Sequence, residues 1–150
     1  MANADKALLS LAENHRHGIG TTLALLDEVL CLVEDWAGGR ERKGVLYEER
    51  NNLSQPQRRA LSRETARIRK RLETARCDLK LTTASRDAVS DIWSRCASLR
   101  ENVMELEGRQ LRRYGAPGPE LEAYMDSLSH DLLAALDRLL RALQAKGSLR

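Results

Sequence analysis

Apolar residues recur at alternating spacings of three and four along four long stretches of the chain, residues 5–37, 55–81, 85–114 and 119–146. This spacing puts them on one face of an α-helix and is typical of helices that pack lengthwise against other helices. At a rise of 1.5 Å per residue, each stretch predicts a helix about 40–50 Å long. The first stretch shows the strictest alternation, through Leu8, Ala12, His15, Ile19, Thr22, Leu26, Val29, Val33 and Trp36.

Capping residues predict where these helices begin and end. Ser54 and Gln57 form a capping-box pattern before the second stretch, and Gly38 is expected to end the first in a left-handed conformation. The weakest boundary is Leu81–Ser85, which contains neither Gly nor Pro, so the second and third helices could also continue as one rod. Two threonines and a possible cap at Ser85 favour a turn there.

Four helices of matched length predict an all-α fold, an antiparallel four-helix bundle that forms a single domain over residues 1–150. The one longer crossover covers about residues 38–54 and has a basic tip. We expect Val45, Leu46 and Tyr47 to dock on the bundle end as a short helix, and residues 47–51 to act as a capping and docking segment. A functional loop is the alternative for this crossover.

Composition narrows the class of protein. The chain has no Phe, only two Trp and three Tyr, so its core must be almost wholly aliphatic. No apolar run approaches the roughly 18 residues that a membrane-spanning helix needs, and the first residues do not resemble a signal peptide. Cys31, Cys77 and Cys96 lack the spacing of a disulfide framework or a zinc site, which favours a reducing compartment. We therefore expect a cytoplasmic protein.

Charge is distributed unevenly although the net charge is only +3. Residues 1–39 are acidic and residues 40–80 are strongly basic. In the second helix, basic residues fall opposite the apolar face or flank that position, and the predicted anionic-partner or nucleic-acid contacts are Arg58, Arg59, Arg63, Arg67, Arg69, Lys70, Arg76 and Lys80. Such an array can contact phosphate backbones without reading sequence, because no aromatic residue alternates with it. An ordinary solvated face and an acidic protein partner are the alternatives.

The first, third and fourth helices carry more apolar residues than one stripe requires. Such helices either lie centrally in a bundle or face a partner. We expect oligomerisation or docking on a protein partner, with filling of the bundle interior as the alternative. The predicted interface residues are Leu25, Leu32, Trp36, Trp93, Met104, Leu111, Leu133 and Leu140.

Histidines and carboxylates do not form a recognisable catalytic or metal-binding pattern. None of His15, His17 and His130 follows a Glu at the spacing that di-iron bundles use. We expect His15 to be a hydrogen-bonded interior residue and His130 to lie at the surface. No phosphate-binding loop or nucleophile motif is present either, so we expect no catalytic activity, metal, cofactor or small-molecule substrate.

One short segment suggests a different class of function. Residues 17–23, His-Gly-Ile-Gly-Thr-Thr-Leu, resemble the phospho-accepting box of sensor histidine kinases, which reads His-Glu-Leu-Arg-Thr-Pro-Leu. The resemblance implies phosphotransfer through His17 in a helical dimerisation domain. It covers seven residues and lacks the family's Glu and Arg, and chance, with Gly18 and Gly20 marking a kink or a close helix crossing, is the alternative.

Taken together, these patterns predict a non-catalytic interaction or assembly subunit, or an adaptor. It would dock through apolar helix faces, and its Arg-rich helix over residues 58–80 could contact a nucleic-acid backbone or another anionic surface. Phosphotransfer through His17 is the alternative function.

Overall fold

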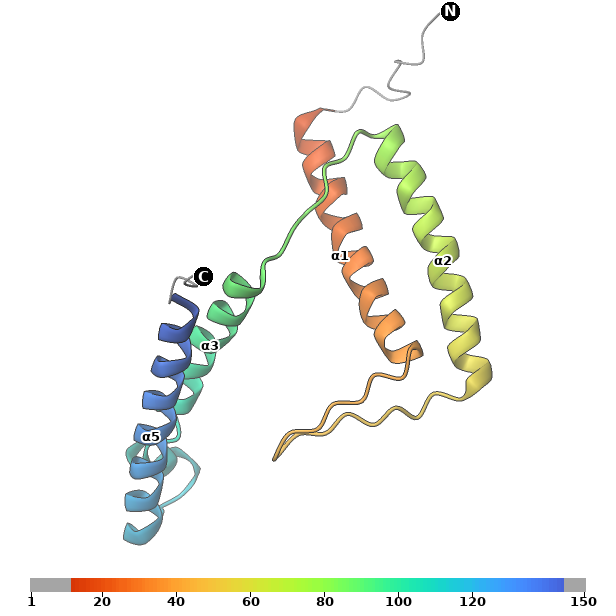
Figure 1. Ribbon diagram of the computed structural model, residues 1–150. Coiled ribbons are helices and arrows are strands. Elements are labelled where there is room, and N and C mark those ends of the chain that lie inside the picture. Colours follow the sequence, from red (N-terminus) through yellow and green to blue (C-terminus); the bar gives the residue numbers. More distant parts are fainter. Residues whose placement is uncertain (1–11, 145–150) are drawn as a thin grey trace, which may run out of the picture. The chain divides into compact units, whose positions relative to one another are not determined.

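The computed structural model describes residues 12–144, and this part of the chain is all-α, as the sequence predicts. Its residues group into two compact units, which within this part of the chain are residues 12–84 and 85–144 (Figure 1). The antiparallel four-helix topology and the single domain stay predictions. Leu8 and the end of the last predicted helix lie outside the described residues. No helix within residues 12–144 combines the length and apolar character needed to cross a membrane.

The first unit is an antiparallel helical hairpin of α1 (Glu13–Ala37) packed against α2 (Gln55–Asp78) (Figure 1). Helix α2 begins as predicted: the Ser54 side chain accepts a hydrogen bond from the Gln57 backbone at 3.4 Å, and the Gln57 side chain accepts one from the Ser54 backbone at 2.8 Å. At the end of α1, Gly39 rather than Gly38 adopts the left-handed conformation, with φ of +97°.

The face of α1 that meets α2 differs from the predicted stripe. Leu30 is buried there, whereas Leu26, Val29 and Thr22 of the predicted stripe are exposed. The interior position predicted for His15 is also wrong, because this residue is exposed. Helix α1 has apolar residues on adjoining stripes, and the one that packs on α2 is rotated from the strict alternation.

The crossover between α1 and α2 forms an extended hairpin, not a docked short helix. Lys43 and Glu48 form an isolated antiparallel bridge, and the Gly44 backbone N–H donates to the Tyr47 carbonyl at 2.7 Å. Val45 and Leu46 occupy the tip and are 99% and 100% exposed. The docking prediction for these residues is therefore wrong.

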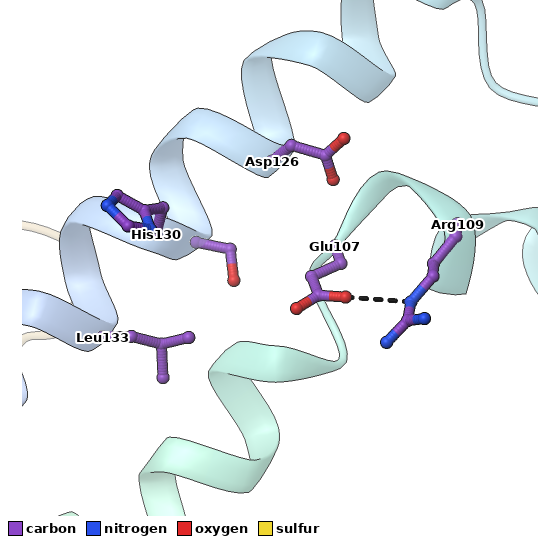
Figure 2. Close-up of a pocket in the computed structure, with 6 residues that line it drawn as sticks. Glu107, Arg109, Asp126, His130 and Leu133 are labelled. Atoms are coloured by element: carbon purple, nitrogen blue, oxygen red, sulfur yellow. Dashed lines mark hydrogen bonds and ion pairs between the residues drawn. The ribbon is translucent and has the colours of Figure 1, made fainter.

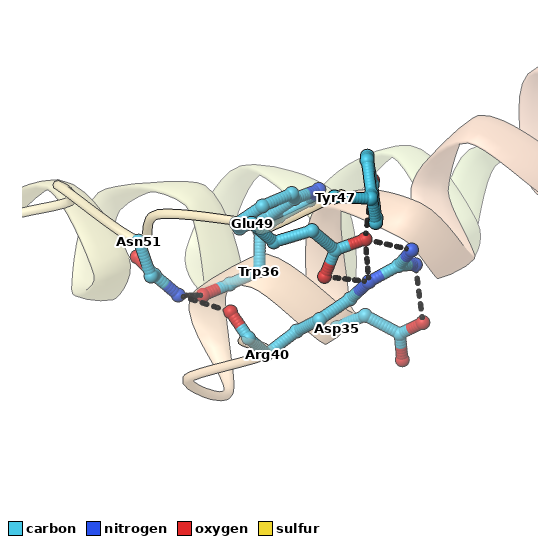
Figure 3. Close-up of polar contacts among 6 residues, drawn as sticks. All are labelled: Asp35, Trp36, Arg40, Tyr47, Glu49 and Asn51. Carbon is cyan, nitrogen blue, oxygen red and sulfur yellow. Dashed lines mark hydrogen bonds and ion pairs between the residues drawn. The ribbon is translucent and has the colours of Figure 1, made fainter. Parts of the chain in front are cut away.

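A cluster of polar contacts, which we call the clasp, fixes the base of this hairpin (Figure 3). The Arg40 guanidinium donates to both carboxylate oxygens of buried Glu49, with the shortest distance 2.6 Å, and the Tyr47 hydroxyl donates to the same carboxylate at 3.1 Å. The hydrogen bond from Arg40 lowers the pKa of Glu49. The Asn51 side-chain amide donates to the Trp36 carbonyl at 2.7 Å, which confirms a capping role for the segment after the tip.

The second unit contains α3 (Ala88–Met104), α4 (Gly108–Leu111), the 3₁₀ helix η1 (Arg112–Tyr114) and α5 (Pro119–Gln144). Helices α3 and α5 pack antiparallel, and α4 also packs on α5 (Figure 1). Helices α2 and α3 are separate, as predicted, but residues 81–87 between them have no regular secondary structure and do not form the predicted turn. The cap of α3 is Asp87 and not Ser85: the Asp87 carboxylate accepts a hydrogen bond from the Ser90 backbone at 2.8 Å.

The predicted continuous helix over residues 85–114 is wrong, because the chain breaks after Met104 and restarts as α4. Gly108 explains the restart. It is buried against α5, and a Cβ atom added to it would lie 2.8 Å from Glu122 Cα. Its backbone N–H donates to the Asp126 carboxylate at 2.8 Å. Only glycine allows this close approach between α4 and α5.

Candidate interaction surfaces

Helix α2 presents an exposed row of cations, which we call the basic ridge: Arg59, Arg63, Arg67, Lys70 and Arg71. Within residues 12–144, Arg59, Arg63, Lys70 and Arg71 make no side-chain hydrogen bond or ion pair. Arg67 is 73% exposed and pairs with Glu64 of the same helix at 2.7 Å. Exposed pairs of this kind contribute little to stability, so Arg67 can exchange its partner readily.

Arg71 was not among the predicted contacts although it belongs to this surface. On a helical projection it lies 120° from Arg59, at the edge of the ridge, and the structure shows that it forms no ion pair within residues 12–144. Arg76 is exposed but forms a pair with Glu73 at 2.6 Å. Lys80 follows the end of α2, with a φ of 50°.

Arg58 and Arg69 make contacts within the helical hairpin of α1 and α2. Arg58 Nε donates to the Leu53 carbonyl at 3.2 Å, next to the start of α2. Arg69 reaches across to α1, where Nη2 lies 2.9 Å from a Glu34 oxygen and Nε lies 3.6 Å from an Asp27 oxygen. The opposite charges of Arg69 on α2 and of Asp27 and Glu34 on α1 thus help to hold the two helices together.

Four of the apolar residues of α1 form a second surface, which we call the α1 stripe: Leu25, Leu26, Val29 and Leu32. All four are exposed, with Leu25 at 57% and Val29 at 53%. Trp36, the third interface residue predicted on this helix, is only partly exposed, and the Arg40 guanidinium lies over its ring at 5.6 Å. The stripe is therefore available to a partner, whereas Trp36 belongs largely to the clasp.

The interface residues predicted in the second unit divide into two groups. Trp93 and Met104 are about half exposed on α3. Leu111, Leu133 and Leu140 are partly buried within the packing of α3, α4 and α5. Further apolar residues of this unit are exposed that the predicted set did not include: Ile92, Leu99, Leu121, Leu132 and Leu139.

His17 is exposed on α1, as phosphotransfer would require. A Cβ atom at Gly18 would meet nothing within 4 Å and one at Gly20 only Leu81 at 3.9 Å, so neither glycine marks a close helix crossing. His130 is exposed, as predicted. Across the described part of the chain, no three His, Cys, Asp or Glu residues are grouped as metal ligands. Phosphotransfer through His17 stays a prediction.

A pocket of about 420 Å³ lies where α4 meets α5, lined by Glu107, Arg109, Asp126, Ser129, His130 and Leu133 (Figure 2). Its polar groups mostly bond to one another or to backbone. Glu107 pairs with Arg109 at 3.0 Å, Asp126 accepts from the Gly108 backbone, and buried Ser129 donates to the Val103 carbonyl at 3.0 Å. The Asp126 bond holds α4 against α5 and the Ser129 bond holds α3 against α5, whereas the Glu107–Arg109 pair is local to α4, so the pocket is part of the structural junction.

Comparison with known proteins gives no match to any family model, curated protein or solved structure. The basic ridge and the α1 stripe are therefore the features of the molecule that point to its function.

Proposed function

We propose that this protein is a non-catalytic assembly subunit that contacts an anionic surface through the basic ridge and docks on protein through its apolar helix faces. The observation that carries the proposal is the state of the ridge cations. Arg59, Arg63, Lys70 and Arg71 are exposed and unpaired within residues 12–144. Four neighbouring cations without acidic partners create a local positive potential that favours an anionic ligand.

A nucleic-acid backbone is the first candidate for that ligand. The ridge extends from Arg59 to Arg71 along one rigid helix, which is about 18 Å at 1.5 Å per residue. Four of its five cations are arginines, whose planar fork matches two oxygens of one phosphate. Helix α2 contains no aromatic residue on which a base could stack. The expected binding is therefore independent of sequence and strongly dependent on salt.

The test is fluorescence anisotropy of the full chain with labelled duplex DNA, duplex RNA and single-stranded RNA over a series of salt concentrations. Each phosphate contact contributes about 0.9 to the slope of log affinity against log salt for duplex DNA. The variant with Arg59, Arg63, Arg67 and Lys70 changed to Glu should lose binding. Changing any one of these residues to Ala should reduce the slope of log affinity against log salt by about 0.9, the contribution of one phosphate contact.

The matched control changes four exposed arginines of the second unit to Glu, namely Arg95, Arg113, Arg138 and Arg141, which gives the same net charge. Circular dichroism verifies that both variants keep their helices. If the control loses affinity as much as the ridge variant does, net charge and not the ridge governs binding. If wild-type protein binds none of the nucleic acids at low salt, the nucleic-acid candidate is wrong.

A further inference from the structure

Helix α1 is apolar at four of the seven heptad positions. With Ile19, Leu26 and Val33 at position a and Thr22, Val29 and Trp36 at d, the e positions are Leu23, Leu30 and Ala37 and the g positions are Gly18, Leu25 and Leu32. A two-stranded contact needs only a and d, so apolar e and g positions are typical of a helix with neighbours on two sides.

Helix α2 covers only one of these two sides. Leu30 at position e is 4% exposed and Leu23 is partly buried, whereas Leu25, Val29 and Leu32 on the g side remain open. Because Leu30 is the only buried apolar residue that the structure describes in the first unit, the hairpin lacks a closed core of its own. Helical units of this size usually need additional stabilisation, for example by association.

The open side continues from α1 onto α2. Asp27, Glu34 and Arg69 meet on one side of the antiparallel hairpin. On helical projections, the opposite side of the hairpin carries the α1 stripe on α1 and Ile68 on α2. Ile68 is 37% exposed. The hairpin therefore has one side joined by ion pairs and one broad apolar side formed by both helices.

We propose that the partner of this apolar side is the same side of a second copy of the chain. The proposal rests on the assembly function above and names the occupant of its apolar surface. Two helical hairpins that face each other form a four-helix bundle, and a two-fold axis makes such a contact self-complementary. The α1 stripe would then lie in the shared core.

The charges of the hairpin favour this occupant. The acidic residues Asp27 and Glu34 fall at heptad position b, on the other side of the helix from the α1 stripe. Glu28 and Asp35 fall at c, which borders the g positions of the stripe, so association places them at the rim of the contact and not at its centre. Helix α1 has one basic and five acidic side chains, and α2 has eight basic and three acidic ones. In a two-fold arrangement the opposite net charges of α1 and of the partner's α2 attract each other, which needs no direct pair with a ridge residue. The basic ridge, on the far face of α2, stays free.

Sedimentation equilibrium and light scattering on the full chain test this inference. Wild-type protein should have the mass of a dimer that dissociates on dilution. Changing Leu25 and Val29 to Glu should give a folded monomer, because both side chains are more than half exposed within one copy. The matched control, Ala66→Glu with Thr74→Glu, adds the same two charges at exposed positions on the polar face of α2 and should remain a dimer.

A wild-type monomer at every concentration overturns the inference, and so does a folded Leu25→Glu, Val29→Glu variant that remains a dimer. If that variant loses its helical circular dichroism signal, Leu25→Ser with Val29→Ser takes its place in the same measurement. Failure of the second-copy contact can be distinguished from failure of the proposed nucleic-acid binding. A monomer whose binding depends on the ridge refutes only the second-copy contact, whereas a dimer without ridge-dependent binding refutes only the proposed ligand.

Discussion

Two glycine-to-alanine substitutions are expected to change stability in opposite directions. At Gly108 the new Cβ would lie 2.8 Å from both Cα and Cβ of Glu122 and 3.0 Å from its carbonyl oxygen. Two of these three atoms are backbone, so no rotamer change can move them, and α4 has to shift away from α5. Overpacking of this kind costs about 1–3 kcal/mol. The loss includes strain on the Gly108–Asp126 hydrogen bond.

Gly18 is the matched case because it lies inside α1 and its new Cβ would meet nothing within 4 Å. Alanine there removes backbone freedom from the unfolded chain without a steric cost. Replacement of glycine by alanine inside a helix stabilises by about 0.5–1 kcal/mol. The same chemical change should therefore stabilise the first unit and destabilise the second.

Tryptophan fluorescence can follow each unit separately, since Trp36 lies in α1 and Trp93 in α3. Urea denaturation of the Trp36→Phe background reports on the second unit, and that of the Trp93→Phe background reports on the first. The midpoint should fall for Gly108→Ala and rise for Gly18→Ala, with unchanged slopes. A Gly108→Ala protein as stable as its parent would refute the close approach of α4 to α5.

Three further predictions concern the caps and the histidine. Asn51→Asp removes the donor to the Trp36 carbonyl and places a negative charge at the C-terminal end of α1. It should therefore destabilise the first unit by about 1–2 kcal/mol, measured by urea denaturation in the Trp93→Phe background. An unchanged midpoint would contradict the capping role of Asn51. The hydrogen bond from the Ser90 backbone lowers the pKa of the Asp87 carboxyl group below its ordinary value of 3.8. The ionised carboxylate therefore stabilises the folded protein fully at pH values above 3.8, and this stabilisation is lost as the pH falls through the lower pKa of the folded state. Proton titration by NMR should show the lowered pKa, and Asp87→Asn should remove this part of the acid dependence while still capping α3. Incubation with acetyl phosphate should not label the wild type, and labelling that disappears in His17→Gln would favour phosphotransfer over the function proposed here.

Features set by local chemistry could be predicted from the sequence. The start of α2 follows from Ser54 and Gln57, which satisfy each other's backbone groups within one turn. The start of α5 at Pro119 follows from the fixed φ of proline at a first helical position. The exposed positions of Arg59, Arg63 and Lys70 follow from their place opposite the apolar residues of α2, whatever that helix packs against.

Features set by distant residues could not be predicted. Val45 and Leu46 suggested a docked helix because apolar residues are usually covered. Their exposure results from the clasp, in which Arg40 and Glu49 meet across nine positions and hold the two arms together. Similarly, the apolar spacing continues beyond Met104, and only the packing of Gly108 on α5 shows why the chain restarts there as α4.

The error in the α1 register has the same origin and bears directly on function. The strict alternation through Thr22, Leu26 and Val29 is a sound signal for a helix seam, yet α2 packs on the adjoining e positions around Leu30. A helix that is apolar at a, d, e and g offers two seams, and its own sequence does not say which one the neighbouring helix takes. Because α2 takes one, Thr22, Leu26 and Val29 of the a/d seam stay exposed, whereas Ile19 and Val33 are partly buried. Leu26 and Val29, two of the residues that misplaced the core, also belong to the α1 stripe, and the second-copy contact accounts for their exposure. Loss of the dimer on changing Leu25 and Val29 is the result that would connect the two.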